Sequence, residues 1–137
     1  MNALFGSLDV AYSGMDVYKA WLDATADNVA NVNTVRRTSE DAFQSKYVIA
    51  RSLAGRNGSA IGRGTSFAGV ALGDPNGKVV YDPTHPLADA QGMVRYPDVD
   101  LGEQMTNMLI AQRAYQANVT VFERARDAYT RALEIGK

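Results

Sequence analysis

The last third of the chain, residues 101–135, contains no proline and no glycine apart from Gly102. A stretch without an internal helix breaker predicts one long helix, of about 50 Å at 1.5 Å per residue. At 100° per residue, its apolar residues do not gather in the single stripe of an ordinary surface helix. They form two lines about 120° apart, and this pattern limits what the helix can pack against.

The two lines differ in side-chain size. The first holds large residues: Met108, Tyr115, Val119, Phe122, Tyr129 and Leu133. The second is mostly alanine: Ile110, Ala114, Ala117, Val121, Ala125, Ala128, Ala132 and Ile135. Because alanine lets a second backbone come close, the pattern favours a helix that packs on two sides. The central helix of an ordinary bundle would show the same pattern.

Residues 3–31 predict a second long helix. Apolar and small residues recur there in steps of four and three, the a/d spacing of a coiled-coil heptad: Leu4, Leu8, Ala11, Met15, Tyr18, Leu22, Thr25 and Val29. Gly6 and Gly14 lie inside this stretch, and each costs about 1 kcal/mol relative to alanine. We therefore expect this helix to be firm only when it is packed. Asp9, Asp16 and Asp23 recur every seven residues on its flank, as a solvated or partner-facing edge.

The middle of the chain has the composition of a small β-rich module. Short strands are predicted at 43–49, 67–72, 78–81 and 93–96, and residues 74–77 have the turn chemistry of a hairpin between the second and third. Residues 54–66 are rich in glycine and read as a flexible surface connection. Asp100, with Glu103 three residues later, resembles a capping box that begins the last helix.

These elements predict a mainly α protein, in which long N- and C-terminal helices pair as an antiparallel coiled-coil hairpin with the small β-rich insert between them. The expected division is 1–34 for the N-terminal helix, 35–97 for the β-rich module and 98–137 for the C-terminal helix. One stripe of the last helix would then be left uncovered. A long exposed apolar stripe marks an interaction surface, so we expect an obligate assembly.

Composition gives little support to catalysis. The chain has no cysteine and one histidine, His85, which excludes thiolate sites and leaves no clustered ligands for zinc. A Ser-His-Asp triad has no Gly-x-Ser-x-Gly elbow to support it, and the glycine-rich loop lacks the ending of a phosphate-binding loop. His85 is therefore interpreted as a turn or surface residue. We expect no enzymatic activity, no cofactor and no metal.

Charge and hydropathy limit the partners further. There are 14 basic and 15 acidic residues, so general nucleic-acid binding is not expected. The middle of the chain is locally basic and is interpreted as a solvated face or one that meets an acidic neighbour. Its basic residues are Arg36, Arg37, Lys46, Arg51, Arg56 and Arg63. No apolar run approaches the ~20 residues of a membrane span. The first residues lack the basic and apolar regions of a cleaved signal peptide.

Several motifs resemble those of one known family. Residues 81–89 read YDPTHPLAD, 92–100 read GMVRYPDVD and 112–119 read QRAYQANV, and residues 27–34, DNVANVNT, follow the heptad helix. These runs resemble the bacterial flagellar basal-body rod proteins, most of all a short member of the proximal rod. The resemblance covers the whole chain. The chain departs from the family after Thr34, where a Gly/Pro-containing link is usual.

The resemblance implies a structural subunit of the proximal rod, which polymerises helically into the drive shaft that transmits motor torque. It implies export through the flagellar type III apparatus without a cleaved signal peptide, and location in the basal body, in the rod that crosses the periplasm. The implied partners are copies of the chain, other rod proteins and an adapter at the membrane-embedded ring near the export gate. A soluble coiled-coil adapter or chaperone-like binding protein is the alternative reading.

Two groups of site residues follow. The predicted assembly interface consists of Leu4, Leu8, Ala11, Met15, Leu22, Val29, Met105, Met108, Tyr115, Val119, Phe122, Ala114, Ala117, Val121, Ala125 and Ala128. The positions that carry the family motif are Asn28, Ala30, Asn31, Asp82, Pro83, Pro86, Gln116 and Asn118. Within the interface we expect the large residues to pack inside the subunit and the alanine line to meet neighbours.

Overall fold

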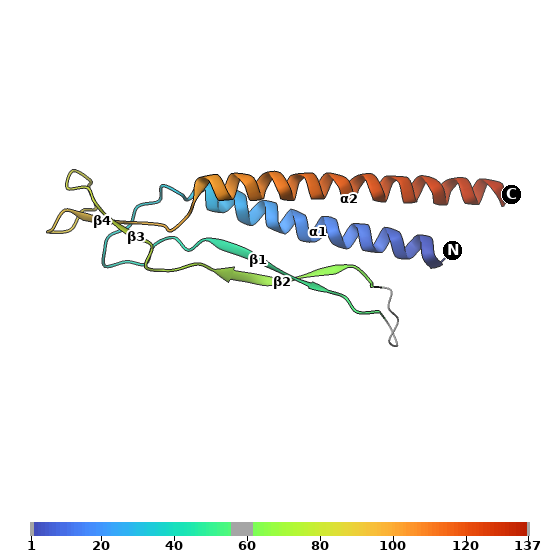
Figure 1. Cartoon of the computed structure of the whole chain (residues 1–137), viewed down its shortest axis with the longest axis horizontal. Coiled ribbons are helices and arrows are strands. Elements are labelled where there is room, and N and C mark those ends of the chain that lie inside the picture. Colours follow the sequence, from blue (N-terminus) through green and yellow to red (C-terminus); the bar gives the residue numbers. More distant parts are fainter. Residues whose placement is uncertain (1, 56–61, 137) are drawn as a thin grey trace. The chain divides into compact units, whose positions relative to one another are not determined.

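The computed structural model describes residues 2–55 and 62–136, with the side chains of residues 2–5 outside that description. Two helices enclose four strands along the chain, in the order α1 (Asn2–Ala30), β1 (Lys46–Ser52), β2 (Thr65–Leu72), β3 (Lys78–Tyr81), β4 (Met93–Tyr96) and α2 (Leu101–Ile135) (Figure 1). Both predicted helices and the predicted strands at 78–81 and 93–96 are confirmed. The first strand begins three residues later than expected.

The chain divides into two compact units, and both helices contribute to both. Unit 1 comprises Met1–Leu22, Val48–Gly69 and Leu109–Lys137. Unit 2 comprises Asp23–Tyr47 and Val70–Met108. Unit 1 is therefore built from three segments of the chain and unit 2 from two, so neither unit is one continuous stretch.

The four strands form two separate two-stranded sheets, β1 with β2 and β3 with β4. The predicted hairpin between residues 67–72 and 78–81 is therefore wrong, although a turn does occur at 74–77. β3 instead runs antiparallel to β4, with Lys78 opposite Tyr96 and Tyr81 opposite Met93. The turn carries its own restraint, because Gly77 has a φ of 56° and a Cβ there would lie 2.1 Å from the Tyr96 carbonyl oxygen.

Side chains define the inner ends of the two helices. Asp100 Oδ1 accepts a hydrogen bond from the Glu103 backbone N–H at 2.8 Å, which confirms the predicted start of α2. At the end of α1, the Asn31 amide donates to the Asp27 carbonyl at 2.9 Å. Thr34 then donates to Asn31 Oδ1 at 3.1 Å, so the turn after α1 is held by side chains.

The core of unit 2 lies under β4. Val94 is fully buried, and Ala42 and Val99 are nearly so. The link after α1 joins this core through an antiparallel bridge in which Arg36 and Arg95 exchange both backbone hydrogen bonds at 2.9 Å. β4 thus has β3 on one edge and Arg36 on the other. This gives the link after Thr34 a defined place without the family's usual glycine or proline.

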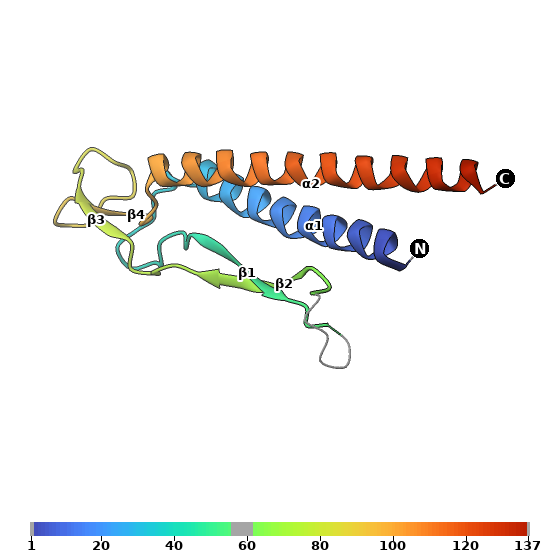
Figure 2. The same cartoon turned by 45° about the vertical axis from the view of Figure 1, so that its right-hand side comes forward.

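Unit 1 combines the N-terminal part of α1, the C-terminal part of α2 and most of the β1–β2 hairpin. Its buried side chains are Ala11, Val17 and Ala111. Both Figure 1 and Figure 2 show the N-terminal end of α1 beside the C-terminal part of α2, so these helix segments run in opposite directions within unit 1. The hairpin is closed by Leu53, which donates to Gly64 O at 2.8 Å and accepts from Arg63 N at 3.0 Å.

Candidate functional site

The inward face of α2 has a two-part pattern. The less exposed positions in unit 1 recur in steps of three and four and alternate small or polar with large side chains: Ala111, Tyr115, Asn118, Phe122, Ala125 and Tyr129. In unit 2 the same spacing continues back to Met108 and Gln104. Such spacing is the a/d repeat of a helix that packs along one seam. Gln104 and Ala111 are almost completely buried, and neither was selected from the sequence.

The two apolar lines of α2 differ in exposure. From the large line, Met108, Tyr115, Val119 and Phe122 are half-buried. From the alanine line, the exposed members in unit 1 are Ile110, Ala117, Val121, Ala128, Ala132 and Ile135, whereas Ala114 and Ala125 are half-buried. Met105, also placed in the interface by sequence, is 59% exposed at the start of the helix. A set of apolar side chains on α2 is therefore exposed within the chain's described part.

The described residues of the predicted α1 seam are buried or half-buried. Ala11 is buried, and the side chains of Leu8, Met15, Leu22 and Val29 are half-buried. The side chain of the remaining predicted residue, Leu4, lies outside the described residues. α1 is also buried on a second side, at positions not in that seam: Val17, Ala24 and Asn28. The helix covered on two sides is therefore α1, whereas the two-lined α2 keeps one line exposed.

α1 and α2 approach closely at Gly14 in unit 1. A Cβ at this glycine would lie 2.7 Å from Oδ1 of Asn118, closer than side chains normally approach. The Asn118 amide donates to the Ala114 carbonyl of its own helix at 2.9 Å, which fixes the group that fills the space. Gly6, by contrast, has nothing within 4 Å of its Cβ position. The two glycines inside α1 thus have different roles.

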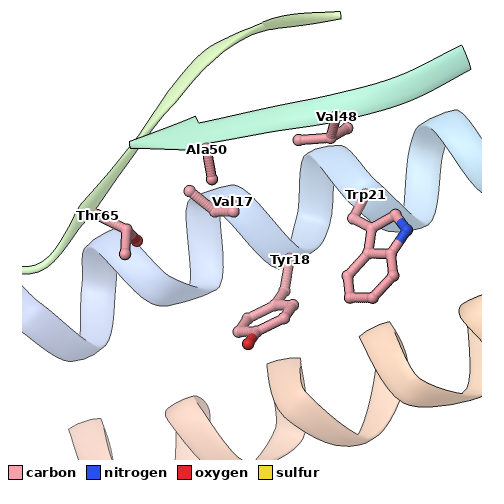
Figure 3. Close-up of a pocket in the computed structure, with 6 residues that line it drawn as sticks. All are labelled: Val17, Tyr18, Trp21, Val48, Ala50 and Thr65. Atoms are coloured by element: carbon pink, nitrogen blue, oxygen red, sulfur yellow. The ribbon is translucent and has the colours of Figure 1, made fainter. Parts of the chain in front are cut away.

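A pocket of about 320 Å³ lies in unit 1 between α1 and the first hairpin. It is lined by Val17, Tyr18, Trp21, Val48, Ala50 and Thr65 (Figure 3). The rings of Tyr18 and Trp21 are stacked, with centroids 6.0 Å apart. Beside it, Ser13 Oγ accepts a hydrogen bond from Thr65 N at 3.1 Å. The lining has no charged group, and the pocket can accept apolar side chains.

Unit 2 contains a buried polar contact centred on Asn28, which is 1% exposed. Its amide donates to Gln104 Oε1 at 2.9 Å and to the Lys46 carbonyl at 3.0 Å, and its Oδ1 accepts from Lys46 N at 2.7 Å. One side chain of α1 therefore bonds to α2 and to both backbone groups at the start of β1. A buried amide with all these partners satisfied specifies one arrangement of the three elements.

A second polar cluster orders the loop before β4. Asp89 accepts hydrogen bonds from Met93 N at 2.9 Å, Thr38 Oγ1 at 2.8 Å and Gln91 N at 3.0 Å. The Met93 N–H, followed by the Thr38 hydroxyl, holds the pKa of the Asp89 carboxyl below its ordinary value. Arg95 donates to the carbonyls of Thr38 and Asn76, which ties the link after α1 to the turn before β3.

Exposed ion pairs add little to this unit. Lys78 Nζ lies 2.8 Å from Asp98 Oδ1, and the hydrogen bond to Asp98 raises the pKa of the Lys78 ammonium. Lys46 also pairs with Asp27, beside the Asn28 contact. Because solvent screens both pairs, they contribute little to stability. The order of unit 2 therefore rests on its buried hydrogen bonds and its apolar core.

The remaining motif positions are dispersed. Asp82 accepts from Thr84 Oγ1 at 2.9 Å, and Pro83 lies 3.0 Å from the Cβ position of Gly92, so both shape the turn after β3. The exposed motif residues are Ala30, Pro83, Pro86 and Gln116. These motif positions therefore shape a local turn or lie at the surface.

The described residues form no cluster suited to metal binding, and the single histidine holds a turn. His85 Nδ1 accepts a hydrogen bond from the Leu87 backbone N–H at 3.1 Å, and this bond holds the turn. Over residues 2–55 and 62–136, no three His, Cys, Asp or Glu side chains are placed to share a metal ion. Neither described helix is long and apolar enough to cross a membrane. Arg36, Arg37, Arg51 and Arg63 of the basic middle are exposed, and Arg56 lies outside the described residues.

Comparison with known proteins agrees with the resemblance in the motifs. The sequence profile of the family described as flagellar basal body rod FlgEFG protein, C-terminal, matches residues 90–135. The flagellar basal-body rod protein FlgC of Escherichia coli O6:H1 is 34% identical over 135 residues, covering 98% of this chain and 99% of that protein. The FlgC proteins of Bacillus subtilis (32% identity, 97% and 98% covered) and Borreliella burgdorferi (30%, 96% and 97%) are also similar.

Proposed function

Because this chain belongs to the FlgC family of flagellar basal-body rod proteins, it is a structural subunit of the rod, and we propose that its helices form an antiparallel coiled-coil hairpin there. The basal body is its location, and other rod components are its neighbours. The rod names of the relatives suggest a protein that is not an enzyme. The alternative of a soluble adapter is not favoured by this membership.

The hairpin proposal is supported by one contact between the helices in each unit. Gly14 approaches Asn118 in unit 1, and Asn28 bonds to Gln104 in unit 2. The two positions are 14 residues apart on α1 and 14 residues apart on α2, in opposite directions along the chain. Two heptads separate the contacts on both helices, as a regular antiparallel coiled coil requires.

The observation that carries the assembly proposal is the exposed apolar line of α2. Ile110 and Val121 are each about half exposed, and Ala117, Ala128 and Ala132 lie on the same line. Small side chains would let a neighbouring helix approach closely, and an exposed apolar line this long is rare on a protein that works alone. We infer that this line packs against adjacent subunits in a helical, non-closing assembly.

In this arrangement the rod transmits motor torque through many lateral contacts between subunits. Residues 1–34 and 98–137 would form its helical layer, and residues 35–97 the β-rich module attached to it. Copies of this chain, other rod proteins and the adapter at the membrane ring would be the neighbours. Export through the flagellar type III apparatus would deliver the subunit. The support for each of these points is the membership of the FlgC family together with the exposed apolar line of α2.

The test is to fill the close contact. Ala117→Leu should block incorporation into basal bodies, because overpacking a tight contact costs about 1–3 kcal/mol in each of many repeated contacts. The purified variant should keep the helix content of the wild-type chain, since Ala117 is exposed in the single subunit. The readouts are the amount of chain in isolated basal bodies, swimming, and circular dichroism.

The matched control is Gln112→Leu, which places the same leucine side chain on the other, polar side of α2. It should assemble normally. Normal rods with Ala117→Leu would show that the alanine line is not a tight interface. Normal swimming after deletion of the whole chain would remove the rod assignment itself.

A further inference from the structure

Two exposed helix faces of unit 1 carry opposite charges at the same spacing. On α1, Asp9, Tyr12 and Asp16 form the acidic face; on α2, Arg124, Ala128 and Arg131 form the arginine face. All six side chains are exposed, and Tyr12 is 65% exposed despite its large ring. In each face the two charges are seven residues apart, about 10.5 Å along a helix.

Within the described residues, both faces point away from the close contact between α1 and α2 in unit 1. At 100° per residue, the acidic face lies roughly 140–160° round α1 from Gly14, which meets α2. The arginine face lies roughly 80–140° round α2 from Asn118, which meets Gly14. Across residues 2–55 and 62–136, the four charged side chains of the two faces take part in no ion pair.

We propose that the acidic face of one copy docks on the arginine face of a second copy, so that this chain binds itself within the rod. The inference rests on the proposed assembly and names its partner. Opposite charge selects that partner, because a copy of the chain presents the complementary face that each face requires. The two faces are different surfaces, so the contact is heterologous and can repeat without closing.

The register is set by the residues between the charges. Aligned antiparallel, Asp9 lies level with Arg131, Tyr12 with Ala128 and Asp16 with Arg124, all without a shift. The large tyrosine ring thus meets the smallest side chain of the arginine face, and it lies between two guanidinium groups that can stack on it. Copies that share one polarity, as in a rod, would present α1 and α2 to each other antiparallel.

Charge reversal tests the pairing. Asp16→Arg and Arg124→Asp should each raise the concentration for half-assembly of the purified full chain about tenfold or more, because each places like charges together. An equimolar mixture should return to within about threefold of wild type, since alternating copies pair opposite charges at every contact. The double variant Asp16→Arg, Arg124→Asp should recover in the same way.

The matched controls change the charge equally but elsewhere. Glu123→Arg lies next to Arg124 on the polar side of α2, and Arg51→Asp lies on exposed β1; both should assemble as wild type does. Single reversals that assemble like wild type would overturn the proposal. So would a mixture or double variant that assembles no better than the single reversals.

Cross-linking gives a second readout in basal bodies, and it exploits the absence of native cysteine. A chain with Tyr12→Cys and Ala128→Cys should give a ladder of disulfide-linked copies on oxidation. Tyr12→Cys with Glu123→Cys is the control and should remain monomeric. No ladder, or equal ladders in both, would overturn the docking between copies. Recovery of the wild-type chain in basal bodies, measured in parallel, tests the rod function separately from the docking between copies.

Discussion

The two units of this subunit are held in different ways. Unit 2 surrounds the buried hydrogen bond between Asn28 and Gln104, and its strand β4 is bonded along both edges. Unit 1 relies on helix packing around Gly14 and leaves apolar side chains on α2 exposed. In unit 2, the buried hydrogen bonds of Asn28 fix how the elements of a single chain are arranged. In the proposed assembly, the exposed apolar side chains of α2 in unit 1 would be covered by other chains.

The largest effect is expected from removing the amide of unit 2. Asn28→Ala should lower the free energy of unfolding by about 2–4 kcal/mol, because it leaves buried groups of Lys46 and Gln104 without partners. Chemical denaturation of the purified chain measures the loss. The matched change in unit 1 is Asn118→Ala, whose amide bonds only within its own helix. An equal loss in both would remove the contrast between the units.

A smaller effect is expected from filling the close approach in unit 1. Gly14→Leu should cost about 1–3 kcal/mol by overpacking against Asn118, despite the higher helix propensity of leucine. Gly6→Leu, at the open position of the same helix, should be neutral or slightly stabilising. Hydrogen exchange should place the loss in the helix segments of unit 1. If exchange accelerates equally in unit 2, the two units do not open separately.

The smallest effect is expected on the stability of unit 2 at acid pH. Because the folded-state pKa of Asp89 lies below its ordinary value of 3.8, its hydrogen bonds stabilise unit 2 above that pH. This contribution is lost as the pH falls through the lowered pKa. Asp89→Asn should therefore flatten the pH dependence of unfolding below about pH 4, with hydrogen exchange of β4 as the readout. Asp127→Asn, in unit 1, should leave that dependence unchanged.

Sequence patterns predicted the elements better than their pairing. The heptad positions of α1, the capping aspartate of α2 and the bounds of β3 and β4 follow from local chemistry, so they could be predicted. The turn at 74–77 also follows from its own residues, but strand pairing depends on residues far apart in the sequence. β2 is already bonded to β1, and β3 finds β4 through Gly77, whose position under Tyr96 depends on distant residues.

The buried line of α2 shows why part of the site was missed. Gln104 and Ala111, which are buried, recur with the half-buried Asn118 every seven residues, which is a heptad signal, but only Asn118 was named from the sequence, as a motif position. Their side chains are polar or small, however, so a search for apolar periodicity passes over them. Whether Gln104 is buried is decided by Asn28, 76 residues earlier in the chain. Only the fold brings the two amides together.

The Asn28 contact also has a consequence for which substitutions the chain tolerates. Asn28 bonds to the backbone N–H and carbonyl of Lys46 and not to its side chain, so any residue with a backbone N–H can occupy position 46 without loss of either bond. No other residue type offers both an acceptor and a two-hydrogen donor on so short a stem. Position 46 can therefore change without loss of these two hydrogen bonds, whereas position 28 must remain asparagine to keep them.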